Sequence, residues 1–216
     1  MIVAQRLRNG ACGSPRGADR LVADALATVA KLNATDASEP KVKPLLRADS
    51  AFYGHPTVSA AIKKGADLSI TARLDKRVKA AIATIGDDAW ETIQYTDAIF
   101  DEETKRWVSR AEVTEIPFTA FASRKKSEQV PGRLVVRRIP DLNLKTSDEQ
   151  DTLFDTWRFH AFFTIGSLDT VTADKTHRGH DIIDSPKHFV QGGAPSPRRP
   201  EKFGSGTFTL KPLCCQ

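Results

Sequence analysis

The stretch from Val42 to Leu74 constrains the fold more than any other part of the sequence. It places a short apolar run at Val42–Ala48, a helical pattern at Pro56–Gly65 and an alternating apolar pattern at Leu68–Leu74. A strand, a helix and a strand in this order favour two parallel strands joined by a helical crossover. Pro44 fits the beginning of the first strand, where a missing amide donor is tolerated. The sequence therefore predicts an α/β fold with a parallel component in its sheet.

The residues upstream of this stretch predict a short strand at Met1–Arg8 and then a helix. Ser14-Pro15 combines a hydroxyl N-cap with proline at the first helical position. A buried face follows, because apolar residues recur at helical spacing: Leu21, Val22, Ala25, Leu26, Val29 and Leu32. In the helix at Pro56–Gly65, Val58, Ala61 and Ile62 are expected to face inward.

The middle third has a different pattern, and it predicts a β-rich lobe inserted at residues 76–165. A short helical segment, Lys76–Ile85, is followed by strand-like segments: Thr92–Tyr95, Arg106–Val108, Ala111–Phe121, Arg133–Ile139 and Phe159–Ile165. Its tryptophans, Trp90, Trp107 and Trp157, are interpreted as anchors of packing rather than platforms for stacking bases.

The last part of the chain predicts one more helix and then a tail. Thr172–Ile183 has the pattern of a helix start, within a segment at residues 166–184. From Ser185 onward, a tract rich in proline, glycine and arginine predicts an extended or disordered tail at residues 185–216.

Charge and cysteine content limit the possible cellular location and binding partners of the protein. The chain of 216 residues has a net charge of +5 and a pI near 9.2, a mild excess that favours polyanionic partners. Its three cysteines fit neither a disulfide framework nor a zinc motif, so we expect reduced thiols. No apolar run reaches membrane-spanning length. We expect a cytoplasmic protein that does not contact membranes.

Asp49 is the first candidate site residue, because it follows the predicted strand Val42–Ala48. In open α/β sheets, reactive groups gather beyond the carboxyl ends of the strands. A carboxylate there is suited to binding one of the two divalent metal ions that drive phosphodiester chemistry. The other interpretation is a side-chain cap for the next segment, and the pattern alone favours that cap.

Histidines and basic clusters supply the remaining candidates. His177 and His180 lie three apart on one predicted helical face, where they would bind a metal or phosphate, or would be exposed or capping residues, which the pattern favours. Arg124-Lys125-Lys126 and Arg137-Arg138 would follow DNA phosphates, or would form solvated faces.

Several segments together resemble the DDE-type insertion-sequence transposases of the actinobacterial branch, which carry a β-strand insertion. The matching segments extend in order over residues 1–183: Ser14–Ala18, Leu21–Leu26, Arg47–Tyr53, Ser69–Arg73, Glu115–Phe121 and His177–His180. Arg47-Ala48-Asp49-Ser50 is the most specific among them. The resemblance implies a ribonuclease-H-like mixed sheet with helices, whose first part, without its first strand, is residues 1–75.

The resemblance also implies a catalytic triad of two Asp and one Glu that binds Mg²⁺ or Mn²⁺. Asp49 matches the second Asp, and the first is expected upstream of a segment like Met1–Arg8. Asp184 stands where the family has Glu, and Ser185-Pro186 interrupts the family's helix there. Asp49 and Asp184 are thus the implied catalytic and metal-binding residues of a chain truncated at its N-terminus and altered at its C-terminus.

By the same resemblance, His177, Arg178 and His180 are expected to contact DNA, together with Arg124, Lys125 and Lys126. The implied partners are the inverted-repeat ends of a transposon and target DNA, and also a second copy of the chain or an intact transposase. The expected function is that of a DDE transposase fragment, inactive alone. The alternatives are a non-catalytic DNA-binding or regulatory module and a remnant without function. A chain bound to DNA is expected to be associated with the bacterial nucleoid.

Overall fold

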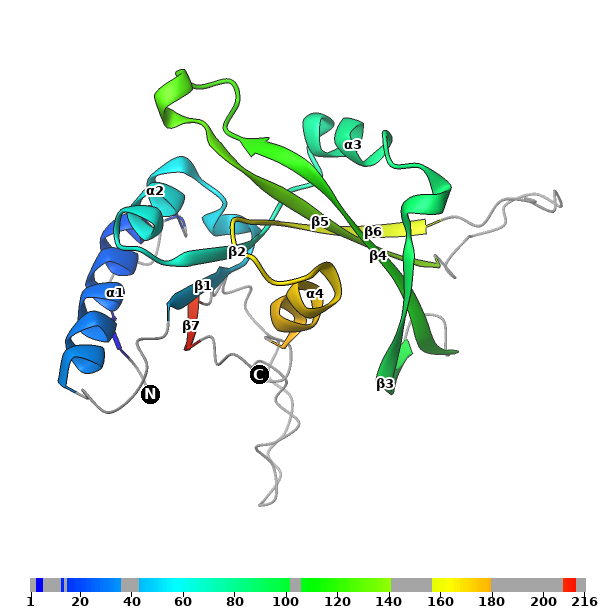
Figure 1. Cartoon of the computed structure of the whole chain (residues 1–216), viewed down its shortest axis with the longest axis horizontal. Helices are drawn as coiled ribbons and strands as arrows, with labels where there is room; N and C mark the ends of the chain where they lie inside the picture. The colour runs from blue at the N-terminus through cyan, green and yellow to red at the C-terminus, as the bar shows by residue number, and fades with distance from the viewer. Residues whose placement is uncertain are drawn as a thin grey trace, which may run out of the picture. The chain divides into compact units, whose positions relative to one another are not determined.

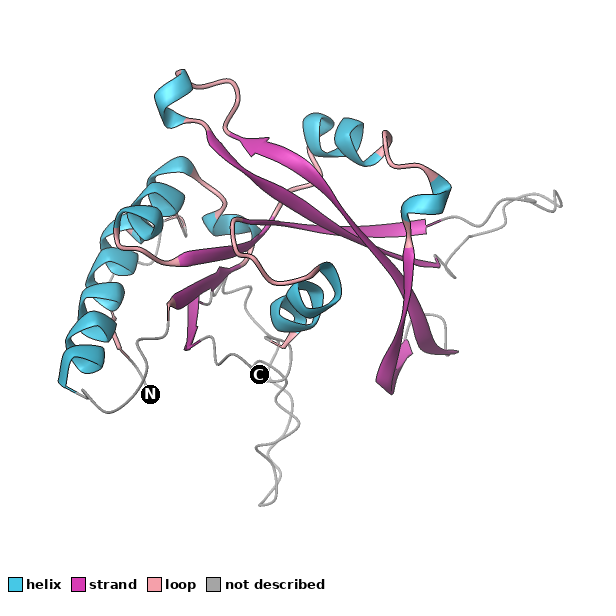
Figure 2. Cartoon of the chain, in the orientation of Figure 1, coloured by secondary structure: helices cyan, strands magenta, loops and turns pink. Residues whose placement is uncertain are grey.

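The chain folds into two compact units. The computed structural model describes residues 3–5, 13, 15–35, 43–101, 106–140, 157–179 and 208–212 (Figures 1 and 2). The first unit combines residues 1–70 with residues 175–216, and the second is the continuous segment 71–174. Both contain strands and helices, so the mixed α/β class predicted from the sequence is confirmed.

The first unit is built on the predicted parallel pair of strands. β1 (Pro44–Ala48) and β2 (Asp67–Thr71) run parallel, with Leu45 opposite Asp67 and Arg47 opposite Ser69. Lys43 Nζ and Asp67 Oδ1, 2.5 Å apart, form an ion pair where these strands begin. β7 (Phe208–Pro212) pairs antiparallel with the other edge of β1. The tail was predicted to be extended or disordered, and residues 208–212 of it are extended, as a strand of this sheet.

Two helices pack together in the first unit. α1 (Ala18–Thr35) begins three residues after Pro15, and residues 15–17 form a turn before it. Its apolar stripe buries Val22, Ala25 and Leu26, as predicted. Leu32, which was expected to face inward, is 46% exposed, because the buried stripe covers only the earlier turns of the helix.

α2 (His55–Lys63) follows Gly54, with Pro56 in its first turn. It ends at Lys64 and Gly65, whose φ of 75° lies in the left-handed region that glycine adopts without strain. Val58 and Ala61 are fully buried, but Ile62 is 37% exposed and does not face the core as expected.

The second strand of the parallel pair also differs from its expected pattern. β2 is buried at every position from Asp67 to Ile70, so its two faces do not alternate between core and solvent. Strands in parallel sheets are commonly covered on both faces. Leu74, at the end of the predicted strand, lies beyond β2 and is 39% exposed.

The second unit is a meander of four antiparallel strands in the order β3–β4–β5–β6: β3 (Glu91–Asp101), β4 (Arg106–Ala120), β5 (Val130–Pro140) and β6 (Trp157–Thr164). Two strand segments predicted separately join in the single strand β4. Gly132 on β5 has no room for a side chain, since a Cβ there would lie 2.7 Å from Phe163 and from the carbonyl oxygen of Thr164.

Helices cover opposite faces of this meander. α3 (Lys76–Ile82) is capped by Asp75, whose Oδ1 accepts hydrogen bonds from the amides of Arg77 and Val78. Arg77 of α3 lies over Phe118 on one face of β4. The start of α4 (Thr170–Arg178) packs on the other face, where Ala173 joins a core with Val113, Val135 and Phe162. Side chains alternate between faces along each strand, so one sheet carries both helices.

The loop that leads into α4 is held by a charged cluster. Arg133 on β5 bonds to Glu115 on β4 and donates hydrogen bonds to the carbonyl oxygens of Gly166 and Leu168. Thr170 Oγ1 donates to the same Glu115 carboxylate at 2.7 Å. These contacts fix the first turn of α4 against the meander.

Three sequence predictions involve residues that are only partly described. Residues 3–5, within the strand predicted at Met1–Arg8, form no strand. α4 begins at Thr170, two residues before the predicted start, and Arg178 is its last residue. His180 and Asp184 lie outside the described residues. In the described ranges, no helix has the length and apolar character needed to cross a membrane.

Candidate functional site

The end of β1 places Asp49 at the edge of the first unit's sheet. Ala48 is the last residue of the strand, and Asp49 continues in extended conformation with φ −76° and ψ 177°. Its Oδ1 accepts a hydrogen bond from the Ala51 amide at 2.7 Å, which caps the short 3₁₀ helix η1 (Ser50–Phe52). The capping role favoured by the pattern is therefore present. It uses one carboxylate oxygen, and the half-buried side chain sits where a reactive group is expected.

Arg47 connects the same strand to the last turn of α4. Its side chain is 1% exposed, and Nη2 donates a hydrogen bond to the carbonyl oxygen of His177. A buried guanidinium needs such partners, because its desolvation is costly. Arg47 and Asp49 lie two residues apart in extended chain, so their side chains project to the same side of the sheet.

Ser69 on the neighbouring strand makes a second contact with His177. It is opposite Arg47 in the parallel register, and its Oγ lies 2.7 Å from Nδ1 of His177. The carboxyl ends of β1 and β2 therefore hold one residue of α4 by its backbone and by its ring. This arrangement fixes the last turn of α4 on the side of the sheet to which Asp49 projects.

A divalent cation needs more donors than the described residues bring to this place. The described ranges contain no group of three or more His, Cys, Asp or Glu that could hold a metal ion. Asp49 contributes one carboxylate, and His177 directs Nδ1 to Ser69. The implied partner Asp184 lies outside the described residues, so Asp49 is the one member of the implied donor set for Mg²⁺ or Mn²⁺ that the structure describes.

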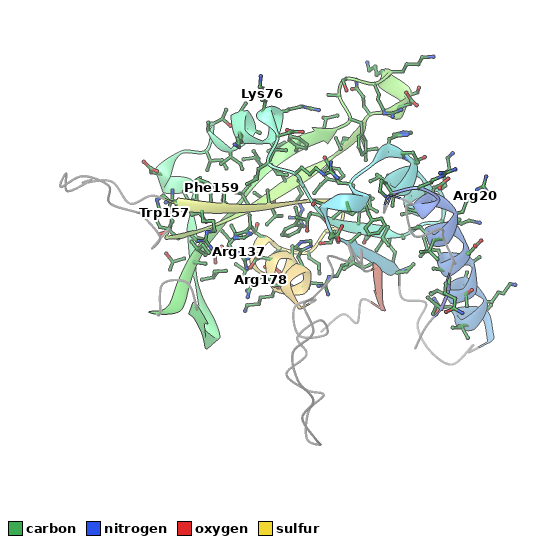
Figure 3. The ribbon with its side chains drawn as sticks, turned by 180° about the vertical axis from the view of Figure 1, so that it is seen from behind. Arg20, Lys76, Arg137, Trp157, Phe159 and Arg178 are labelled. Carbon is green, nitrogen blue, oxygen red and sulfur yellow. The ribbon has the colours of Figure 1, made fainter. Side chains whose placement is uncertain are left out.

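The other residues predicted to contact DNA lie at two places. Arg178 ends α4 and is half-buried (Figure 3). Arg124, Lys125 and Lys126 belong to the loop between β4 and β5, and all three side chains are exposed. Side chains make contacts within that loop: Gln129 Nε2 lies 3.1 Å from the carbonyl oxygens of both Ala122 and Arg124, and Arg124 pairs with Glu128 at 3.4 Å.

Arg137 and Arg138, which were proposed as one basic cluster, do not form one. As neighbours on β5, their side chains project to opposite faces of the meander. The Arg138 guanidinium lies between two tryptophan rings, 4.2 Å from the centre of Trp90 and 4.3 Å from that of Trp157. Its Nε also contacts Glu112 Oε2 at 2.6 Å. Arg138 therefore packs against these side chains, and these contacts occupy the guanidinium that was predicted to contact DNA phosphate.

Trp90 and Trp157 are packing anchors, as predicted, and they also border a cavity of about 670 Å³. Trp157 and Phe159 lie close together along β6 (Figure 3), and Phe159 is 6.1 Å from the Trp90 ring centre. Leu74, Ile82 and Ile85 complete the apolar part of the lining. The side chain of Trp107 is not among those described.

Sequence reasoning missed Arg47, Ser69 and the Trp90–Arg138–Trp157 sandwich. A signal for Arg47 was present, since one arginine interrupts the apolar run Leu45–Ala48 and a charge in a buried strand needs a dedicated partner. Nothing local distinguishes Ser69 from any other strand serine, because its partner His177 is far away in sequence.

Comparison with known proteins does not assign this chain to a family. No protein-family model matches the chain, and no curated protein matches it.

Proposed function

We propose that the chain is a DNA-binding protein related to the DDE transposases, with a ribonuclease-H-like first unit. In this proposal Asp49 stands at the position of a metal-binding carboxylate, and His177 and Arg178 belong to the helix that approaches DNA. The chain alone does not cut or join DNA. Its partners are transposon-end DNA and target DNA, with a second copy or an intact transposase as protein partner.

One observation carries this proposal: the last turn of α4 is fixed beside the end of β1, on the side to which Asp49 projects. Arg47 and Ser69 make that connection through two atoms of the same residue, His177. A carboxylate after a strand of a parallel pair, with a late helix held next to it, is the arrangement that the resemblance to DDE transposases implies. The exposed Arg124, Lys125 and Lys126 add a polyanion-binding character.

A purely regulatory DNA-binding module is the second candidate. It is favoured by the Asp49 cap, because a carboxylate that holds η1 has a structural reason to be present without any catalysis. The two candidates differ in whether Asp49 also supplies a metal-binding carboxylate or only stabilises the chain.

Two substitutions at Asp49 separate these roles. Asn caps a helix about as well as Asp but supplies no carboxylate, whereas Ala removes both functions. We expect Asp49→Asn to keep the unfolding free energy of the parent within about 0.5 kcal/mol, and Asp49→Ala to lose about 1 kcal/mol.

DNA binding and cleavage are then measured with the same proteins. The substrates are supercoiled plasmid and a duplex taken from the DNA that flanks the gene, each with Mg²⁺ or Mn²⁺. We expect binding that weakens steeply with salt, equal for parent and Asp49→Asn, and no nicked product. Nicking by the parent that disappears in Asp49→Asn would refute inactivity and establish an enzyme. Absence of binding at low salt would refute the whole proposal.

A further inference from the structure

Two short segments of the second unit each carry a local excess of positive charge. Residues 73–79 contain Arg73, Lys76, Arg77 and Lys79, and residues 124–128 contain Arg124, Lys125 and Lys126. Against these seven basic residues stand two acidic ones, Asp75 and Glu128. The resulting excess of five positive charges equals the net charge of +5 of the whole chain, so the rest of the sequence is balanced.

The fold brings the two segments to one corner of the second unit, which we call the basic corner. Arg77 of α3 donates a hydrogen bond to the carbonyl oxygen of Thr119 at 2.6 Å, and its guanidinium lies 4.9 Å from the Phe118 ring centre. Thr119 is next to the last residue of β4, after which the chain enters the loop that carries Arg124–Lys126. α3 and this loop lie near each other at the same end of the β4–β5 hairpin (Figure 1).

The two acidic residues of the corner are already occupied. Asp75 caps α3 through its Oδ1, at 3.0 and 2.9 Å from the amide nitrogens of Arg77 and Val78. Glu128 pairs with Arg124 at 3.4 Å. Four exposed lysines are left, and within the described part of the chain none of them forms an ion pair: Lys76, Lys79, Lys125 and Lys126. The Lys76 side chain points outward from α3 (Figure 3).

We infer that the basic corner binds the phosphate backbone of duplex DNA without regard to sequence. Lysines on flexible stems contact phosphate as point charges and carry no information about base identity. Neither segment contains an aromatic residue on which an unpaired base would stack, as proteins that bind single strands commonly provide. This surface belongs to the second unit and does not include Asp49. The choice of DNA as the polyanion rests on the proposed function.

The test compares two double variants that each remove two exposed lysine charges. Lys76→Gln/Lys125→Gln takes one lysine from each segment of the basic corner. Lys63→Gln/Lys64→Gln removes the same charge from the end of α2, in the first unit. Binding is measured by fluorescence anisotropy with labelled duplexes of two unrelated sequences over a range of KCl concentrations. Thermal unfolding checks that both variants are folded.

We expect the corner variant to bind both duplexes at least roughly tenfold more weakly near 0.1 M KCl, with the slope of log affinity against log salt reduced by about 2. The α2 variant should weaken binding by no more than about threefold, as expected for charges that lie outside the proposed binding surface. Equal losses in the two variants, or a corner variant that keeps the parent's affinity and slope, would overturn the inference while the proposed function stands. If the parent protein binds neither duplex, both the proposed function and this inference are refuted.

Discussion

Arg47 and Arg138 are both arginines on strands, one in each unit, and the fold uses them in opposite ways. Arg47 is almost completely buried and donates a hydrogen bond to a backbone oxygen of α4. Arg138 is packed by side chains, between two indole rings and against two carboxylates, Glu112 at 2.6 Å and Asp87 at 3.6 Å. The first arginine positions a helix end, and the second joins segments of a sheet to each other.

The difference shows what each unit requires of a buried charge. A guanidinium between aromatic rings gains cation–π attraction and covers apolar surface with its stem. Such a residue contributes mainly to stability. A guanidinium that donates a hydrogen bond to a helix carbonyl fixes the position of that helix end. Removing the guanidinium should therefore increase local motion near the candidate site before it affects the rest of the chain. Three substitutions and one change of pH follow, ordered from the largest expected effect to the smallest.

Arg138→Ala should have the largest effect on the free energy of unfolding. It removes the charge between Trp90 and Trp157 and leaves Glu112, only 12% exposed at its side chain, without this partner. Loss of one member of a buried ion pair costs about 3 kcal/mol or more. Urea denaturation of the parent and of the variant measures this loss of unfolding free energy. Arg124→Ala, at an exposed pair, is the control and should cost less than about 0.5 kcal/mol. Equal costs for the two would contradict the packing role of Arg138.

Arg47→Met should cost less but should act at a defined place. Methionine fills a similar volume without a donor, so the hydrogen bond to the His177 carbonyl is lost. We expect about 2 kcal/mol of destabilisation, typical of a hydrogen bond from a charged group. Hydrogen exchange should become faster at the amides of residues 175–179 while β4 and β5 keep their protection. Uniformly faster exchange throughout the chain would show that Arg47 is a general packing residue.

Ser69→Ala should have a smaller effect of the same kind. It removes the 2.7 Å contact with Nδ1 of His177 but leaves the Arg47 contact in place. A single hydrogen bond of this kind contributes about 1 kcal/mol. The double variant with Arg47→Met is the informative measurement, because both contacts hold the same residue. We expect the loss of unfolding free energy in the double variant to differ from the sum of the two single losses. Equality with that sum would indicate that Arg47 and Ser69 act independently.

Lowering the pH should have the smallest effect on stability, and this effect should be confined to the first turn of α4. The hydrogen bonds from Thr172 to Asp169 lower the pKa of this carboxyl below its ordinary value of 3.8. A lowered folded-state pKa gives stability that is present above the unfolded pKa and is lost as the pH falls through the folded value. The first turn of α4 should therefore loosen only below pH 3.8. In Asp169→Asn, NMR titration of the Thr172 amide should lose this transition.

The sequence was sufficient to predict the parallel pair β1 and β2, the helix between them and the position of Asp49. Each of these depends on local periodicity and on chain order, which a single sequence contains. The strands of the second unit were also found, although Arg106–Val108 and Ala111–Phe121 were assigned separately. A strand of fifteen residues with charges at its start gives no continuous apolar signal.

The failed predictions depend on contacts between distant residues. The alternation seen in Leu68–Leu74 predicted a strand with one exposed face, but neighbours from elsewhere in the chain bury both. Arg137 and Arg138 looked like a cluster because adjacency in sequence was taken for adjacency in space. The contact of Ser69 with His177 likewise joins residues that no local pattern relates.

The pairing of β7 with β1 has a consequence for the order in which the chain folds. Pro44 is opposite Pro212, and the whole of the second unit lies between them in sequence. A growing chain can complete the meander before β7 has been synthesised, because residues 71–174 are continuous. Closing such a long loop is entropically costly and slow. We therefore expect the sheet that carries Asp49 to be the last part of the protein to form, with one edge of β1 open until then.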